Sequence, residues 1–429
     1  MLIGLFQRIR KLHAPRGSFI ANVLTLMTGT TIAQAILITI APILTRIYKP
    51  EDFGIFALYM AIVSMIAIIA TGRYELAIML PENDDDAINI VCLSVCIVFF
   101  ISFMTLIVIW LFNAQITKLM GSDKLSIWIY LIPISVLLTG IYQAFNYWSN
   151  RKKQYKRLAI SRIAQSTTTA SVNLEMGFEG FGFSGLILGV LVGQGIATYV
   201  LGWQIWREDK DKQKLISKKK MTENMIKYKD FPRINSIHAF IDSLQTSGIV
   251  FLISSFFGNV ILGFYSFTMR ILQAPFGLIG SAFSQVFIQK ASETYNNGGD
   301  LQSLVKKTMI RLSLIALPIL IILVFFAPDI FTLIFGNNWR EAGVYAQILS
   351  PWFFLNFISS PVSQVPLILD KQKYAFYIGI WYNLSILSSM LIGYLTGNIY
   401  HSLYAMSIIG SLNLLFYIYW IFKISKKYN

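Results

Sequence analysis

The chain alternates long apolar stretches with short polar ones, and its longest polar stretch, Arg207–Arg233, lies just before the midpoint. A helix needs about 20 mainly apolar residues to cross a bilayer. Six stretches of this kind precede the polar stretch and six follow it. They are expected near residues 19–44, 53–80, 87–112, 125–148, 158–178, 184–206, 235–257, 261–288, 307–335, 342–369, 374–396 and 402–422.

The pattern predicts an all-α integral membrane protein of twelve transmembrane helices in two six-helix bundles. We expect an N-terminal bundle over 1–206, a basic linker over 207–234 and a C-terminal bundle over 235–429. The halves also share local sequence, because Phe53-Gly54-Ile55-Phe56 resembles Leu262-Gly263-Phe264-Tyr265. With six spans each, the halves would be parallel repeats about a pseudo-two-fold along the membrane normal, with a central cavity between them.

Composition agrees with a polytopic membrane protein. Hydrophobic residues make up 55% of the chain and charged residues 13%, where soluble domains have about 25% charged residues. The net charge of +15 does not indicate a nucleic-acid partner, because the bases collect in loops on one side, where they suit anionic lipid headgroups.

The distribution of Lys and Arg predicts the orientation. Most of the 36 bases fall in the N-terminal segment, the linker and other loops on its side. The loops on the opposite side hold only Arg46, Lys49, Lys118, Lys124 and Arg340. Because Lys and Arg are retained in cytoplasmic loops, we expect both termini and the linker in the cytoplasm.

Arg73, Arg162 and Arg270 lie in or at the edge of predicted spans. A charge at the bilayer centre costs about 2.5–3.5 kcal/mol, so each should face protein or water. Gln165 and Asn173 follow Arg162 at helical spacing, on one face of the fifth span. We expect these five residues to bind substrate. The alternative for the polar face of the fifth span is hydrogen bonding between packed helices. The alternative for Arg73 is a fixed ion pair with Glu75 in a structural turn.

His238 and Asp242 are one helical turn apart in the seventh span. Both side chains titrate more readily than Arg when they are partly desolvated, which suits coupling to a proton or sodium gradient. The alternative is a structural hydrogen-bonded pair. The sequence has no phosphate-binding loop, nucleophile–base set or metal-ligand spacing, so we expect neither an enzyme nor a cofactor.

Four segments resemble the bacterial polysaccharide repeat-unit flippases, the Wzx-like oligosaccharide flippase family. They are Leu44–Ala87, which contains RYELAI, and Tyr142–Arg162, Gly185–Gln194 and Leu262–Glu293. The resemblance implies the multidrug, oligosaccharidyl-lipid and polysaccharide exporter fold. It also implies that cavity cations hold the diphosphate or acidic sugars of the substrate, and Arg73, Arg162 and Arg270 match the family pattern.

The implied function is to flip undecaprenyl-diphosphate-linked oligosaccharides to the outer leaflet by alternating access, for O-antigen, capsule or exopolysaccharide assembly. Expected partners are the lipid-linked oligosaccharide, membrane lipids, a polysaccharide polymerase and a chain-length regulator. One alternative is a cation-coupled multidrug exporter of the same fold. Another is an integral-membrane polysaccharide polymerase, although such enzymes usually place reactive residues on a large outer loop that this chain lacks.

Overall fold

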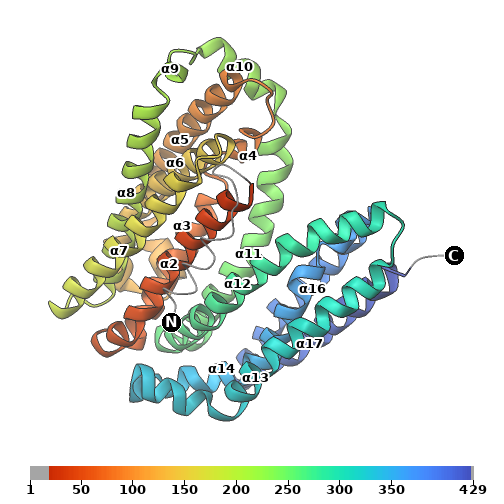
Figure 1. The fold of residues 1–429 in the computed structure, drawn as a ribbon. Helices are drawn as coiled ribbons and strands as arrows, with labels where there is room; N and C mark the ends of the chain where they lie inside the picture. The colour runs from red at the N-terminus through yellow and green to blue at the C-terminus, as the bar shows by residue number, and fades with distance from the viewer. Residues whose placement is uncertain (1–18, 427–429) are drawn as a thin grey trace, which may run out of the picture.

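The computed structural model describes residues 19–426, and helices are the only regular elements among them. The N-terminal bases Arg8, Arg10, Lys11 and Arg16, and Lys427 near the other terminus, lie outside the described residues. Figure 1 shows two groups of long helices joined by a linker that contains short ones.

The first bundle contains α2 (Phe19–Ile47), α3 (Pro50–Ala67), α5 (Asp84–Leu119), α6 (Ile132–Arg151), α7 (Tyr155–Phe178) and α8 (Phe183–Glu208). The second contains α11 (Ser236–Phe257), α12 (Asn259–Asn296), α13 (Leu301–Phe335), α14 (Arg340–Val362), α16 (Gln372–Thr396) and α17 (Ile399–Ile424). Short helices connect them: α4 (Tyr74–Ala77), α9 (Lys210–Gln213), α10 (Lys218–Lys227), α15 (Val365–Ile368), and η1 (Asp123–Leu125), η2 (Trp128–Leu131), η3 (Phe231–Asn235) and η4 (Asn337–Trp339).

The twelve long helices confirm the predicted fold class of a multi-pass membrane protein. Nine helices in the described part of the chain are long and apolar enough to cross a membrane, and α7, α12 and α14 are not among them. Two of these more polar helices carry Arg162 and Arg270. We call the end of the bundles near α9 and α10 the linker end and the other end the far end (Figure 1).

The two bundles meet at the far end through α3 and α12, which touch backbone to backbone. A Cβ atom on Gly54 would lie 1.8 Å from the carbonyl oxygen of Asn259. A Cβ atom on Gly263 would lie 1.8 Å from the carbonyl oxygen of Pro50. No side chain fits at either position, so only glycine permits this approach. The Gly54–Gly263 pair is the local repeat that the sequence comparison of the halves detected.

Aromatic rings surround this contact and close the far end. Phe53 of α3 packs edge-on against Phe267 of α12 at 5.5 Å and against Trp339 of η4 at 5.0 Å between ring centroids. The Trp339 indole donates a hydrogen bond of 2.9 Å to the carbonyl of Thr45 in the first bundle. These rings are almost fully buried. Around this contact the bundles are therefore joined by apolar burial and the Trp339 hydrogen bond, which together we call the far-end seam.

The linker is fixed to the first bundle rather than solvated along its length. Lys212 and Lys220 reach Asp84 and Asp85, at the start of α5, at 3.5 Å each. The fully buried Asn89 donates to the carbonyl of Leu215 at 2.9 Å and accepts from the Ser217 amide at 2.8 Å. At its beginning the linker is held by Arg157, which pairs with Asp209 at 2.8 Å and Glu208 at 2.7 Å.

Two predicted spans are too long. The span over 53–80 ends as α3 at Ala67, and the chain then turns through Gly72 and Arg73, whose φ angles are +58° and +60°. The span over 342–369 ends as α14 at Val362 and is followed by the short α15. The apolar pattern continues past both ends because residues such as Ala70, Ile78 and Val365 are buried in protein.

The far-end seam predicts an effect of adding one methyl group. Gly54→Ala and Gly263→Ala should each lower the apparent melting temperature of the purified protein, because overpacking costs about 1–3 kcal/mol. Gly379→Ala is the matched control, since no atom lies within 4 Å of its Cβ position and alanine favours a helix by about 1 kcal/mol over glycine. Equal melting temperatures for all three variants would show that the seam does not require glycine.

Candidate functional site

Arg270 lies on α12 just beyond the far-end seam. It follows Phe267 by about one turn, so both project from the side of α12 that contacts the first bundle. Phe267 is buried against Phe53, whereas Arg270 is exposed. It makes no ion pair or hydrogen bond with any described residue. The guanidinium is thus free to bind an anion at the point where α12 leaves the seam.

Arg162 lies near the linker end of α7 and contacts α2. Its guanidinium donates a hydrogen bond of 2.5 Å to the hydroxyl of Thr30 and is half-buried. One turn closer to the linker end, Ala159 packs directly on Gly29, where a Cβ would be 2.4 Å from the Ala159 Cβ. Helices α2 and α7 are therefore in close contact on the linker side of Arg162. Arg162 and Arg270 lie at different depths along their helices. We predict that both face the central cavity expected between the bundles.

Gln165 and Asn173 lie on the same face of α7 as predicted, and both contact α8. The Gln165 amide donates to Gln194 at 2.6 Å. Asn173 is 3% exposed, and its side-chain oxygen fills the space left by Gly189, where a Cβ would be 1.8 Å away. This arrangement is the one expected for hydrogen bonding between packed helices. Their role as substrate ligands stays a prediction.

Arg73 occupies the turn between α3 and α4 at the linker end. Its guanidinium lies 3.5 Å from the carboxylate of Glu75, which is almost fully buried. Thr71 donates a hydrogen bond to the same carboxylate. Burial raises the pKa of Glu75, and the Thr71 hydrogen bond and the Arg73 charge oppose that shift. Arg73 thus fixes a turn, and its substrate role stays a prediction.

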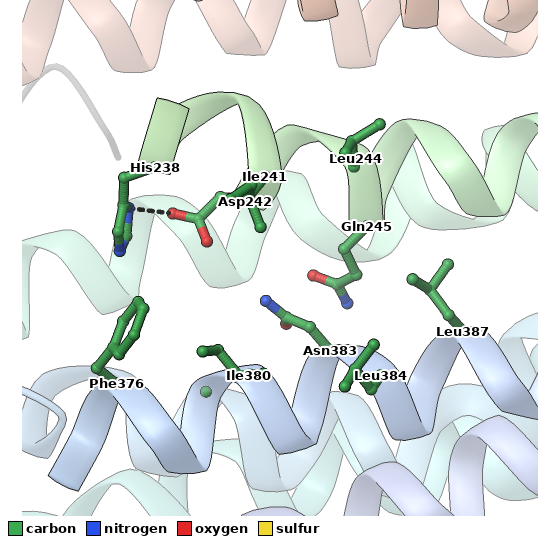
Figure 2. A pocket seen from close by; sticks show the side chains of 11 residues that line it. His238, Ile241, Asp242, Leu244, Gln245, Phe376, Ile380, Asn383, Leu384 and Leu387 are labelled. Carbon is green, nitrogen blue, oxygen red and sulfur yellow. Dashed lines mark ion pairs between the residues drawn. The ribbon is translucent and has the colours of Figure 1, made fainter. Parts of the chain in front are cut away.

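His238 and Asp242 line a groove of about 450 Å³ between α11 and α16 (Figure 2). The His238 Nδ1 lies 3.2 Å from the Asp242 carboxylate, and the two side chains are 51% and 57% exposed. The His238 ring also packs on Phe376 of α16, with 5.2 Å between centroids. The pair that the sequence predicted is therefore formed, and it is open to the groove.

Two further polar side chains line this groove and were not among the predicted site residues. Gln245 of α11 and Asn383 of α16 point toward one another across it (Figure 2). No other charged side chain lines the groove among the described residues. Gln245 follows Asp242 at helical spacing, which is a usable sequence signal. Asn383 gives no local signal, because only the packing of α16 beside α11 brings it here.

Comparisons with known proteins agree on family and fold. A family model described as polysaccharide biosynthesis protein matches residues 43–344. No curated protein sequence matches the chain.

Several solved transporters have a similar structure. One is an inward-facing multidrug resistance MATE family transporter of the MOP superfamily, with a TM-score of 0.70 and 12% identity, over 93% of this chain and 94% of that one. Another is the lipid II flippase MurJ in an inward closed conformation, with a TM-score of 0.70 and 15% identity, over 95% and 90%. A third is a MOP superfamily transporter from Pyrococcus furiosus, with a TM-score of 0.62 and 12% identity, over 95% and 96%.

At these identities the structural likeness establishes the two-bundle transporter fold and nothing finer. The family match covers most of the chain, from the end of α2 to the start of α14. The protein belongs to the polysaccharide biosynthesis protein family, and its fold is that of the MOP superfamily transporters.

Proposed function

We propose that the protein is a flippase for undecaprenyl-diphosphate-linked oligosaccharides, which it moves from the cytoplasmic to the outer leaflet of the inner membrane by alternating access. The observation that carries this proposal is the exposed, unpartnered Arg270 at membrane depth beyond a closed far-end seam. A fixed cation in this position favours an anionic headgroup. It disfavours the cationic compounds that are typical substrates of multidrug exporters.

The far-end seam supports a specific state of the transport cycle. Apart from the contacts of α11, the described contacts between the bundles involve α2, α3, α12, α13 and η4, and the bundles spread apart toward the linker end (Figure 1). If the linker end is cytoplasmic, this arrangement receives substrate from the inner leaflet. Release on the other side then requires the far-end seam to separate and the linker end to close.

The proposed function predicts the effect of removing the Arg270 charge. In vesicles that contain the purified protein, Arg270→Ala should slow the transfer of a fluorescent undecaprenyl-diphosphate-linked oligosaccharide about ten- to a hundredfold. The reason is that a charged hydrogen bond contributes about 1.5–3 kcal/mol. Arg340→Ala is the control, since Arg340 is 61% exposed at the far end and lies 3.7 Å from Asp329. Full activity of Arg270→Ala would remove Arg270 from the substrate site.

We also propose that Asp242, with His238, couples flipping to a proton or sodium gradient. The pair lies 3.2 Å apart in an open groove, and no other charged side chain among the described residues lines that groove. A cation that enters the groove therefore meets the Asp242 carboxylate, and its occupancy can differ between the two states of the cycle.

The coupling proposal is tested with Asp242→Asn in the same vesicles. The variant should bind the lipid substrate normally and should not respond to an imposed proton or sodium gradient. Asp329→Asn serves as the control, because Asp329 is 74% exposed at the far end. A gradient response equal to that of the parent protein would mean that the His238–Asp242 pair is structural.

Orientation is part of the same proposal, with the linker end in the cytoplasm. A reporter inserted at Lys214, whose side chain is 80% exposed, should be active only as a cytoplasmic fusion, because the basic loops gather at that end. A reporter inserted at Gly180, in the far-end turn between α7 and α8, should give the opposite result. Export of the Lys214 fusion would reverse the proposed direction of transport.

A further inference from the structure

A second pocket in the C-terminal bundle lies between α12 and α14, one turn along α12 from Arg270. It has a volume of about 410 Å³ and is lined by Gln273, Asn356 and Ser360 together with several aromatic residues. Gln273 lies about 20 Å along α12 from the start of that helix, which places the pocket at mid-membrane depth. Neither the family match nor the structural neighbours assign a role to it.

The polar residues of the pocket lack the partners that a bilayer position requires. Gln273, Asn356 and Ser360 are all exposed. The side chains of Gln273 and Ser360 make no hydrogen bond with any described residue. An amide without a partner is unfavourable in lipid, so these groups must face water or a polar ligand. Their position therefore indicates a binding surface rather than a contact with lipid tails.

Trp352 gives the pocket one fixed side. Its indole donates a hydrogen bond of 2.9 Å to the Tyr382 hydroxyl, and the side chain is 7% exposed. The exposed Asn356 lies one turn further along α14 and lines the same pocket.

The remaining wall of the pocket is aromatic, with Phe276 half-buried and Phe353 and Phe357 only 7% and 3% exposed. Phe276 stacks on Phe353 with an interplanar angle of 21° and also contacts Phe357 at 5.1 Å between centroids. Beside it, no heavy atom lies within 4 Å of the position that a Cβ of Gly277 would take. A ligand can therefore lie against the backbone of α12 at Gly277. A half-buried ring and an open stretch of backbone next to amides and a hydroxyl suit a molecule with apolar C–H faces and hydroxyl edges, which is the chemistry of a sugar.

We infer that this pocket binds the sugar next to the diphosphate, and that this sugar is a neutral pyranose. The inference rests on the proposed function. None of the described residues that line the pocket is charged, so it offers no counter-ion to an acidic sugar. Arg270 lies about 4.5 Å along the helix axis from Gln273, so a diphosphate at Arg270 places its first sugar beside Gln273 and Asn356.

The experiment compares two ligands on the purified full chain in lipid nanodiscs. One is undecaprenyl diphosphate, and the other is the same lipid bearing a single N-acetylglucosamine. Gln273→Leu and Asn356→Leu should each weaken binding of the sugar-bearing lipid about three- to tenfold, because each removes one hydrogen-bonding group. Binding of the bare diphosphate should change less than twofold.

Gln347→Leu is the matched control. Gln347 is also an amide on α14, but it lies about two and a half turns before Asn356 and so projects from the opposite face. There it donates to the carbonyl of Val324. The Gln347→Leu variant should leave unchanged the ratio of the affinities for the sugar-bearing lipid and for bare undecaprenyl diphosphate. Arg270→Ala should weaken both ligands, which separates the diphosphate contact from the sugar contact.

Three other outcomes would overturn the inference. If the parent protein binds both lipids, and the Gln273 and Asn356 variants bind the sugar-bearing lipid with the same affinity as the parent, the pocket is not a sugar site. If Asn356→Leu tightens both lipids, the pocket holds a lipid tail, and the inference is overturned. If the parent protein binds neither lipid, the proposed function fails first and the sugar site falls with it.

Discussion

The structure depends on one contact without side chains, the approach of Gly54 to Gly263 at the far end. Because neither helix carries a Cβ there, α3 and α12 come close enough for Phe53, Phe267 and Trp339 to pack across the boundary between the bundles. The helices separate after this ring cluster. Arg270 is the next position after Phe267 on the side of α12 that faces the first bundle. It is exposed because the seam ends before it.

The linker determines which parts of the chain can move independently. Its ion pairs with Asp84 and Asp85 and its hydrogen bonds with Asn89 attach α9 and α10 to the first bundle. The far part of α11 packs with α3 and leads through Gly258 directly into α12 of the second bundle. Any rotation of the bundles is consequently absorbed in α11 or in the π-helix at Phe231–Asn235. His238 and Asp242 lie within that segment, so a rotation of the bundles of the kind proposed would change their surroundings.

Much of the fold could be predicted from the sequence, because a bilayer imposes one length and one polarity on every spanning helix. The errors arose where apolar residues serve another purpose. The run through Ile68, Ile69 and Ala70 continues the hydrophobic pattern of α3 but forms a turn packed inside protein. Hydropathy records only that these side chains avoid water, and it does not distinguish lipid from a neighbouring helix.

The candidate site was less predictable for a related reason. Helical spacing identified the polar face of α7 and the His238–Asp242 pair, since both are local. Helical spacing could not tell whether Gln165 faces a cavity or contacts Gln194 of the next helix. A helix that lines a cavity and a helix that hydrogen-bonds to its neighbour both carry polar residues at the same spacing. Asn383 lies 138 residues beyond Gln245 of α11, and Asn356 lies 83 residues beyond Gln273 of α12. At these separations only the fold brings the members of each pair together.

The far-end seam also has a thermodynamic consequence. Its contacts are mainly aromatic surfaces, and an outward opening would transfer those surfaces from protein to water. Exposing apolar area raises the heat capacity, so the equilibrium between the two states of the cycle should be curved in temperature. On cooling, the apolar contribution that holds the seam closed weakens. In the proposed cycle, the balance between inward and outward openings would thus depend on water as much as on the protein, and it would differ from one temperature to the next.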